Sequence, residues 1–288
     1  MMRSRHAGNG SRGLRAGRRT LVTADRSSAA RPADDPARPA SDMPRSGEAS
    51  ASAETRPTRP LSDAEALGLR NEPLLRDLNE DDAIAIRPHV QVTALQRGDR
   101  LYGQGDLGDR LYVVIDGKVK LTRTAPDGRE VLVRVEGPGG MFGELAMFDP
   151  ELRTATATAV TDATLAGLAH EDFRQVLETR PGVAMHMLKA LAQRLREVTE
   201  TNTNLIFTDV PGRVAKALLE LGDRFGVEQD EGILVSHDLT QEELAQLVGA
   251  SRETVNKALA DFATRGWIQL SAKSVLLLDP DRLRRRAR

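Results

Sequence analysis

Residues 181–207 read PGVAMHMLKALAQRLREVTETNTNLIF and divide two regions of different character. Their apolar side chains recur with a spacing of seven residues, in two columns. One column holds Leu188, Leu195 and Asn202, and the other holds Leu191, Val198 and Leu205. Such a repeat is the seam of a two-stranded coiled coil. The sequence therefore predicts a long helix that pairs with its own copy.

Two features favour this pairing over the alternative, a helix buried in the core of one globular unit. The residues beside the seam are charged, namely Arg194, Arg196, Glu197 and Glu200. They leave a narrow seam in place of a broad apolar face. Asn202 is the one polar residue on the seam, and a lone seam asparagine fixes register and two-strandedness. We therefore expect a homodimer formed through residues 181–208.

Composition excludes several classes of protein. The chain has 288 residues, which is room for two domains with separate cores. Cysteine is absent, which excludes disulfides, thiolate metal sites and cysteine-held iron–sulfur clusters. The five histidines are scattered without metal-ligand spacing, so no metal site is predicted. No apolar run approaches the roughly 20 residues of a membrane span. We expect a soluble, cytoplasmic protein without a membrane partner.

Residues 1–60 differ from the rest of the chain. They hold twelve arginines and no lysine against six acids, whereas the whole chain has a net charge of −1. Serine, alanine, proline and glycine dominate, and large apolar side chains are almost absent, so burial cannot offset the entropy of ordering. We expect a disordered basic extension. A functional basic arm, an organelle transit peptide and a start codon placed too far upstream all remain open.

Residues 61–180 predict a roll of short strands. A helical pattern over 61–87 gives way to apolar residues with a period of two. The predicted strands are Val90–Leu95, Leu111–Ile115, Val119–Leu121, Val131–Val135, Thr154–Ala159 and Ala163–Leu168. Glycine-containing turns separate them, and many short strands at this spacing form an antiparallel roll or barrel. A helix over Glu171–Leu177 leads into the long helix.

Residues 209–288 predict a winged helix-turn-helix. Asp209-Val210-Pro211 is a helix start signal. Thr240-Gln241-Glu242-Glu243 is a capping box that opens a second helix. A turn at Gly249-Ala250 follows, and Ser251 caps a third helix, so residues 240–262 have helix-turn-helix spacing. Trp267–Leu270 and Val275–Leu278 predict a hairpin, the wing. The complete prediction is an α+β fold with a jelly-roll-like roll, a dimerisation helix and this C-terminal unit.

The start of the third helix carries residues that suit double-stranded DNA. After the cap Ser251, four side chains face outward, namely Arg252, Glu253, Asn256 and Lys257. Arginine can bond guanine O6 and N7 together, and glutamate can accept from cytosine N4. The alternative is an ordinary solvated face with ion pairs between residues i and i+4. The basic C-terminus, with arginines at 282, 284, 285, 286 and 288, could add phosphate contacts.

A second constellation suits a phosphate. Gly143-Glu144-Leu145 is followed by Arg153-Thr154. A glycine lets backbone N–H groups approach an anion, and an arginine and a hydroxyl nearby favour a phosphate, while the carboxylate suits a ribose hydroxyl. The alternative is a turn with a surface ion pair.

The two constellations together resemble a known family. Gly143-Glu144-Leu145 with Arg153-Thr154 resembles the phosphate-binding cassette of cyclic-nucleotide-binding domains. Residues 251–255, SRETV, resemble the recognition helix of the CRP/FNR family of bacterial transcription factors. The order of roll, long helix and winged helix covers about residues 61–288. The runs DVPGRVAK at 209–216 and NKAL at 256–259 are most similar to actinobacterial regulators of the cAMP-receptor type.

The resemblance assigns roles in the roll. It implies that Arg153 and Thr154 hold the cyclic phosphate with help from the backbone around Gly143. Glu144 would take the ribose 2′-hydroxyl, and Arg194 would lie close to the site.

The resemblance also shows where this chain departs from the family. Adenine contacts come from adjacent hydroxyls on the long helix, one from each subunit. Thr199 fits the second hydroxyl, but Val198 stands where threonine is usual, and valine forms no hydrogen bond. In the recognition helix Lys257 replaces a usual arginine and lacks its fork of donors.

The function expected from these observations is a cAMP-responsive dimeric transcription regulator that binds two-fold operators with TGTGA-like half-sites. RNA polymerase would be a partner when the protein activates. The alternative is the same DNA-binding dimer with a vestigial pocket or a different effector. We expect no enzyme, because the chain has no P-loop, G-x-S-x-G or H-E-x-x-H motif.

Overall fold

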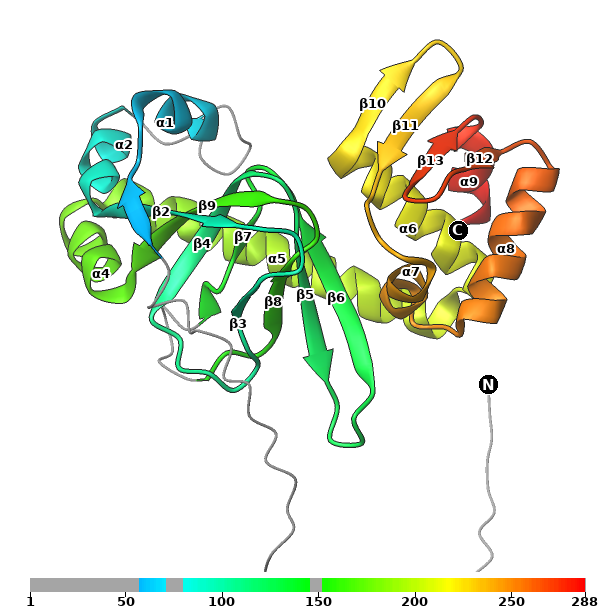
Figure 1. Ribbon diagram of the computed structural model, residues 1–288, viewed down its shortest axis with the longest axis horizontal. Coiled ribbons are helices and arrows are strands. Elements are labelled where there is room, and N and C mark those ends of the chain that lie inside the picture. The colour runs from blue at the N-terminus through cyan, green and yellow to red at the C-terminus, as the bar shows by residue number, and fades with distance from the viewer. Residues whose placement is uncertain (1–56, 71–79, 146–151, 288) are drawn as a thin grey trace, which may run out of the picture. The chain divides into compact units, whose positions relative to one another are not determined.

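The computed structural model describes residues 57–70, 80–145 and 152–287. Its described part contains an antiparallel roll, a long helix and a C-terminal helical unit with its own small sheet (Figure 1). This mixture of helices and antiparallel sheets confirms the predicted α+β fold.

The roll consists of two antiparallel sheets. The first has the strand order β1 (Thr58–Pro60), β2 (Val90–Leu95), β9 (Ala163–Ala169), β4 (Arg110–Asp116) and β7 (Met141–Phe142). The second has the order β3 (Arg100–Tyr102), β8 (Thr156–Ala159), β5 (Val119–Thr124) and β6 (Glu130–Glu136). The six predicted strands correspond to β2, β4, β5, β6, β8 and β9. Strand β1 lies within the segment that the sequence assigned to the extension, and it pairs with β2.

Strand β4 shows how the alternating sequence builds the core. Successive side chains of a strand point to opposite faces. Tyr112 and Val114 are buried in the cluster that the two sheets share, whereas Leu111 and Val113 are buried against the helices. This strand is therefore apolar on both faces, which explains its unbroken apolar sequence.

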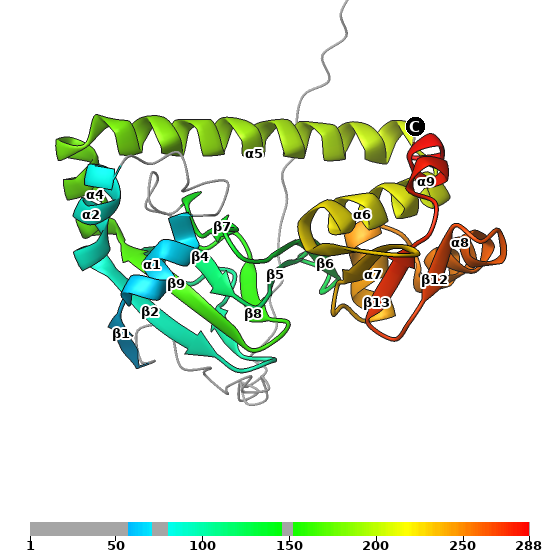
Figure 2. The same ribbon diagram turned by 90° about the horizontal axis from the view of Figure 1, so that it is seen from above.

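Helices cover the outer face of the first sheet. They are α1 (Asp63–Arg70), α2 (Glu80–Ile86), a 3₁₀ turn at Arg87–His89, α4 (His170–Thr179) and the start of α5 (Pro181–Phe207). Phe173 and Val176 of α4 and Val183 and Met187 of α5 join the same buried cluster. The predicted long helix is confirmed as one unbroken element (Figure 2).

The seam of α5 leaves large apolar side chains exposed. Leu188, Leu195 and Val198 are 58%, 68% and 49% exposed, although all three are large and apolar. The side chains of Asn202 and Leu205 lie outside the described residues. An exposed apolar row along a helix is unfavourable in water. The described half of the seam is therefore available for a partner.

The C-terminal unit packs its helices on a four-stranded sheet. Its elements are α6 (Val210–Phe225), β10 (Gly226–Gln229), β11 (Gly232–Ser236), α7 (Gln241–Val248), α8 (Arg252–Thr264), β12 (Ile268–Leu270), β13 (Ser274–Leu277) and α9 (Pro280–Arg286). The sheet order is β10-β11-β13-β12. Leu218, Leu244, Phe262 and Leu283 lie in its buried core. Helices α7 and α8 with the β12–β13 hairpin match the predicted helix-turn-helix and wing.

The caps read from the sequence are present. Thr240 accepts from the Glu243 N–H at 3.2 Å, while the Glu243 carboxylate accepts from the Thr240 N–H at 2.7 Å. Gly249 ends α7 in the left-handed conformation, with φ of 68°. Ser251 accepts from the Thr254 N–H at 3.3 Å. These local bonds fix where α8 begins and so which residues stand in its first turn.

Glycine is required at position 226 for a reason other than the one that its place in the sequence indicates. It follows α6 where a left-handed, helix-ending glycine is common, but its φ is −77° and it opens strand β10. A Cβ at this position would lie 2.2 Å from the Gly222 carbonyl oxygen. The close approach of helix and hairpin, and not a positive φ, requires glycine here.

Among residues 57–70, 80–145 and 152–287, no helix combines the length and the apolar character needed to cross a membrane.

Candidate functional site

The residues predicted to bind a phosphate lie around Gly143. This residue has φ of +78°, and a Cβ would lie 2.7 Å from the Arg153 Nη1 and 3.1 Å from the Arg110 carbonyl oxygen. Glycine is therefore required both by its conformation and by the space. Arg153 crosses the backbone at this point and donates from Nη1 to the Gly143 carbonyl at 3.1 Å.

Arg153 is a buried cation with an unused donor. Its residue is 4% exposed, and the guanidinium carbon lies 4.2 Å from the centroid of the Tyr102 ring. Its Nη2 lies 3.5 Å from Asp109 Oδ1, a long contact. Its Nε is buried and finds no hydrogen-bond partner among the described residues. Because leaving a buried donor unpaired costs about 1–3 kcal/mol, the side chain is suited to receive an anion.

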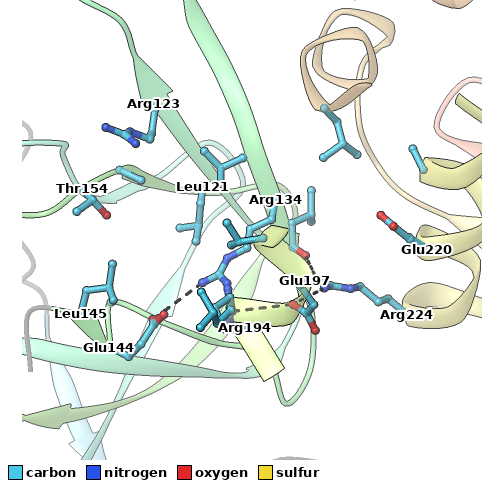
Figure 3. A pocket seen from close by; sticks show the side chains of 18 of the residues that line it. Leu121, Arg123, Arg134, Glu144, Leu145, Thr154, Arg194, Glu197, Glu220 and Arg224 are labelled. Atoms are coloured by element: carbon cyan, nitrogen blue, oxygen red, sulfur yellow. Dashed lines mark hydrogen bonds and ion pairs between the residues drawn. The ribbon is translucent and has the colours of Figure 1, made fainter. Parts of the chain in front are cut away.

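The neighbouring predicted residues line one cavity with Arg153. Its volume is about 1000 Å³, and the cavity walls include strands of the roll and helix α5 (Figure 3). Six of the seven residues predicted for the effector site line it, namely Gly143, Glu144, Leu145, Arg153, Thr154 and Arg194. Glu144 is buried, whereas Thr154 and Leu145 are exposed to the cavity. Ala146, Met147 and Phe148, which continue the motif, lie outside the described residues.

Thr199 is the exception. It does not line this cavity, and its hydroxyl donates to the Leu195 carbonyl at 2.8 Å. Val198, one residue earlier, does line the cavity. The structure therefore separates the two adjacent positions of α5: one faces the site of its own chain and the other does not.

Arg134 of strand β6 lines the pocket and pairs with Glu136 of the same strand, and the sequence pointed to neither residue. Arg134 Nε lies 2.9 Å from Glu136 Oε1, and Arg134 Nη2 lies 4.0 Å from Glu144 Oε2. Arg194 of α5 reaches the same Glu136 oxygen at 3.4 Å. Arg134 and Arg194 also both donate to the Met141 carbonyl, at 3.2 and 3.1 Å. The signal in the sequence is a charge at every second position near the end of an otherwise apolar strand.

Glu136 is the buried centre of this cluster. It is 5% exposed, and burial raises the pKa of its carboxyl group, while Arg134 and Arg224 oppose that rise by favouring the ionised form. Arg224 of α6 lies 3.5 Å from Glu136 Oε2 and donates to the Val135 carbonyl at 3.1 Å. One carboxylate thus contacts arginines from β6, α5 and α6. A buried charge is tolerated only with such partners.

The residues predicted to contact DNA lie together at the start of α8. Arg252, Glu253 and Lys257 are exposed, Asn256 is partly exposed, and Ser251 caps the helix. Arg252 Nη2 and Asn256 Nδ2 both donate to Gln241 Oε1, at 3.3 and 3.2 Å. These two side chains are therefore held by α7, not by the i,i+4 contact of the alternative interpretation. Gln241 was not singled out by the sequence; it directly follows the capping threonine.

Some arginines of the basic C-terminus form ion pairs within the chain. Arg286 Nη2 donates to Asp209 Oδ2 at 2.6 Å, and this hydrogen bond lowers the pKa of the Asp209 carboxyl group. Arg284 is paired with Asp281 at 2.7 Å. Because Asp209 also caps α6, the contact from Arg286 fastens α9 to the start of α6. Arg288 lies outside the described residues.

Comparison with known proteins gives two matching family models. A cyclic nucleotide-binding domain matches residues 92–180, and a Crp-like helix-turn-helix domain matches residues 212–286. A CRP-like cAMP-activated global transcriptional regulator of Mycobacterium tuberculosis is 53% identical over 210 residues, which are 73% of this chain and 94% of that protein.

Solved structures with the same architecture agree. A CRP/FNR-family transcriptional regulator from Thermus thermophilus is 31% identical, with a TM-score of 0.58 over 68% of this chain and 97% of the other. The c-di-GMP responsive global regulator CLP of Xanthomonas campestris is 25% identical, with a TM-score of 0.61 over 69% of this chain and 99% of the other. These relatives are transcription regulators, as the sequence predicted, and not enzymes. The chain belongs to the CRP/FNR family of transcription regulators.

Proposed function

We propose that this regulator is a homodimer whose affinity for two-fold operators with TGTGA-like half-sites is controlled by cAMP bound in the roll. The observation that carries the proposal is the buried guanidinium of Arg153, whose Nη1 contacts Gly143 and whose Nε has no hydrogen-bond partner among the described residues. A cyclic phosphate would supply the missing acceptor and a charge for the cation. A relative 53% identical is named as cAMP-activated, which supports this choice of effector.

The remaining pocket residues support a cyclic nucleotide whose phosphate lies at Arg153. Thr154 adds a hydroxyl beside the phosphate position, and the backbone of Gly143 and Leu145 allows close approach. Glu144 is buried within the cavity and can accept from a ribose 2′-hydroxyl. Arg194 brings α5 into the site through Met141 and Glu136.

Dimerisation is supported by the seam of α5. A second copy of the chain would cover the exposed Leu188, Leu195 and Val198 and so remove their apolar surface from water. In such a dimer Thr199, which does not line its own pocket, would serve the pocket of the partner subunit. Double-stranded DNA would then meet two copies of α8, and RNA polymerase would be a partner at activated promoters.

A different effector is the second candidate. Val198 lines the pocket at a position where it offers no hydrogen bond, which removes one contact to adenine. The structural relative from Xanthomonas campestris is named as responsive to c-di-GMP. The same DNA-binding dimer with another ligand would fit both observations.

Calorimetric titration with cAMP, with and without operator DNA, tests the proposal. We expect one cAMP per subunit and tighter binding in the presence of operator, by roughly 5- to 150-fold for a coupling of about 1–3 kcal/mol. Random DNA of equal length at the same salt concentration is the control. If cAMP does not bind under either condition, its role as effector is refuted. If it binds equally with and without operator, the coupling is refuted.

Two substitutions on α5 test how the pocket communicates with the dimer. Val198→Thr adds a hydroxyl at the pocket and should tighten cAMP binding by roughly 3- to 10-fold, the value of one hydrogen bond of about 1 kcal/mol. Thr199→Ala should weaken cAMP binding and reduce the effect of cAMP on operator affinity together, because coupling between two ligands is reciprocal. Operator affinity measured with and without cAMP checks both variants. Identical ratios in wild type and both variants would show that α5 does not transmit the signal.

A further inference from the structure

A glutamine of α7 is hydrogen-bonded to two residues of α8, the helix beside it (Figure 1). Gln241 is the first residue of α7, and its Oε1 accepts from Arg252 Nη2 at 3.3 Å and from Asn256 Nδ2 at 3.2 Å. A carbonyl oxygen has two lone pairs, and both are used here. Because Arg252 and Asn256 are four residues apart in α8, they lie on one face of that helix and meet the glutamine together.

Arg252 keeps the donors that a guanine needs. Each terminal nitrogen of a guanidinium carries two N–H groups. The contact with Gln241 uses one N–H of Nη2, and among the described residues Nη1 and Nε donate no hydrogen bond. One hydrogen on Nη1 and the second hydrogen on Nη2 therefore remain for the O6 and N7 atoms of guanine. Gln241 can thus hold this side chain from one side while the end of its fork meets a base.

Asn256 does not present the groups that base reading needs. An asparagine pairs with adenine through its oxygen and its nitrogen together. The Oδ1 of Asn256 is buried and has no hydrogen-bond partner within the part of the chain that the structure describes, and its Nδ2 is bonded to Gln241. A buried oxygen does not reach a base edge in the groove. Asn256 therefore differs from its exposed neighbours Glu253 and Lys257.

Stability alone gives no reason for an asparagine at position 256. A buried acceptor without a partner destabilises the folded chain, and asparagine is a weaker helix former than alanine. The side-chain hydrogen bond that Asn256 does form goes to Gln241. The contribution of Asn256 therefore passes through Gln241, which in turn contacts the exposed Arg252.

We propose that Gln241 is a positioning residue for operator recognition, which fixes Arg252 in the orientation that meets guanine, and that Asn256 fixes Gln241. Neither Gln241 nor Asn256 reads a base itself. An arginine whose orientation is set before binding loses less conformational freedom on the DNA, so the preference for operator increases. This inference rests on the proposed function, because it requires Arg252 to read the operator.

The test is the ratio of the dissociation constants for random DNA and operator, measured on the 288-residue chain with cAMP in excess and at matched salt. Gln241→Met keeps the length of the side chain and removes the acceptor. It should lower this ratio roughly 2- to 10-fold for each half-site, the effect of releasing one long side chain, and so roughly 5- to 100-fold for a two-fold site. The ratio does not depend on the fraction of protein that folds.

Gln246→Met is the matched control. Gln246 is a glutamine of the same helix, and among the described residues its side chain forms no hydrogen bond to α8. The ratio in this variant should equal that of wild type. A general disturbance of α7 would lower the ratio in both glutamine variants, and that result would overturn the proposal.

Asn256→Ala separates positioning from a structural role. It should lower the ratio but not the melting temperature, because it removes an unpaired buried acceptor and adds a better helix former. Combined with Gln241→Met, it should lower the ratio no further than Gln241→Met alone, since residues that act through one another are not additive. If Asn256→Ala lowers the ratio by the same factor with and without Gln241, Asn256 reads a base itself and the proposal is wrong.

The Arg252→Ala background separates positioning from a direct contact of Gln241 with DNA. In that background Gln241→Met should leave the affinity for both DNAs unchanged, because there is no arginine to position. A loss of affinity there would show that Gln241 binds DNA directly, and an unchanged ratio for Gln241→Met alone would equally overturn the proposal. If wild type binds operator no better than random DNA, it is the proposed operator recognition that is refuted.

Discussion

Arg153→Ala should reduce cAMP affinity by at least about 100-fold, since it removes two or more charge-assisted hydrogen bonds worth about 1.5–3 kcal/mol each. The guanidinium is buried, and nothing else among the described residues contacts Gly143 in the same way. A phosphate left in this pocket without its cation would be a poorly compensated buried charge. Calorimetry with cAMP measures the effect directly.

The roll should remain folded in this variant. Arg153 makes only one short hydrogen bond within the described residues, to Gly143, and its Nε already has no partner there. Asp109, which loses a 3.5 Å contact, is 42% exposed and regains water. Stacking of the guanidinium on Tyr102 contributes about 0.5–2 kcal/mol, so a modest fall in thermal stability is expected.

Arg110→Ala provides the matched control. Arg110 also pairs with Asp109, at 3.2 Å, but it is not part of the cavity lining. Its loss should leave cAMP affinity within about threefold of wild type, because an exposed ion pair contributes only about 0–1 kcal/mol. Arg153→Lys should fall between the two, since it keeps the charge without the fork of donors. If Arg153→Ala and Arg110→Ala bind cAMP equally well, the phosphate does not sit at Arg153.

What the sequence predicted depends on whether the signal is local. The capping box at Thr240, the cap at Ser251 and the heptads of α5 are all made by residues close in the chain. These signals can therefore be recognised from short spacings in the sequence, and the structure contains the helices that they predict. The glycine–arginine constellation could also be recognised in the sequence, because Gly143 and Arg153 are only ten residues apart.

The cluster around Glu136 could not be predicted from the sequence, because its members come together only in the folded chain. Arg194 is far from Arg134 in sequence, and Arg224 is on a different helix again. The pattern of β6 showed two charges on a strand, but a strand of this kind is as often half exposed, with charges in solvent. Gln241 was missed for a similar reason, since its contacts to α8 cross the helix-turn-helix. The two-residue strand β7 is too short for any period to show.

Arg252→Ala should abolish discrimination between operator and random DNA while leaving salt-sensitive, non-specific binding in place. One arginine–guanine pair contributes about 1–3 kcal/mol of specificity, and a two-fold site uses two, so operator affinity should fall roughly 30-fold to 10⁴-fold. Phosphate contacts elsewhere on the unit do not involve this side chain and should remain.

The structure shows why Arg252 is placed for this role and which control matches it. Arg252 is exposed in the first turn of α8, and its Nη2 donates to Gln241 at 3.3 Å, a contact that orients the fork. Arg265, just after the same helix, pairs with Asp261 at 2.8 Å and lies over the Trp267 ring. Arg265→Ala should therefore cost stability but leave the preference for operator unchanged.

Competition binding at matched salt, with labelled operator against unlabelled operator or random DNA, separates the two kinds of contact. For Arg252→Ala, the two competitors should become nearly equivalent, and the dependence of affinity on salt should stay close to that of wild type, because counterion release comes from phosphate contacts. A variant that loses phosphate contacts instead would keep its preference for operator and show a shallower salt dependence. That second pattern for Arg252→Ala would mean that the arginine binds the DNA backbone and that the bases are read by other residues of α8.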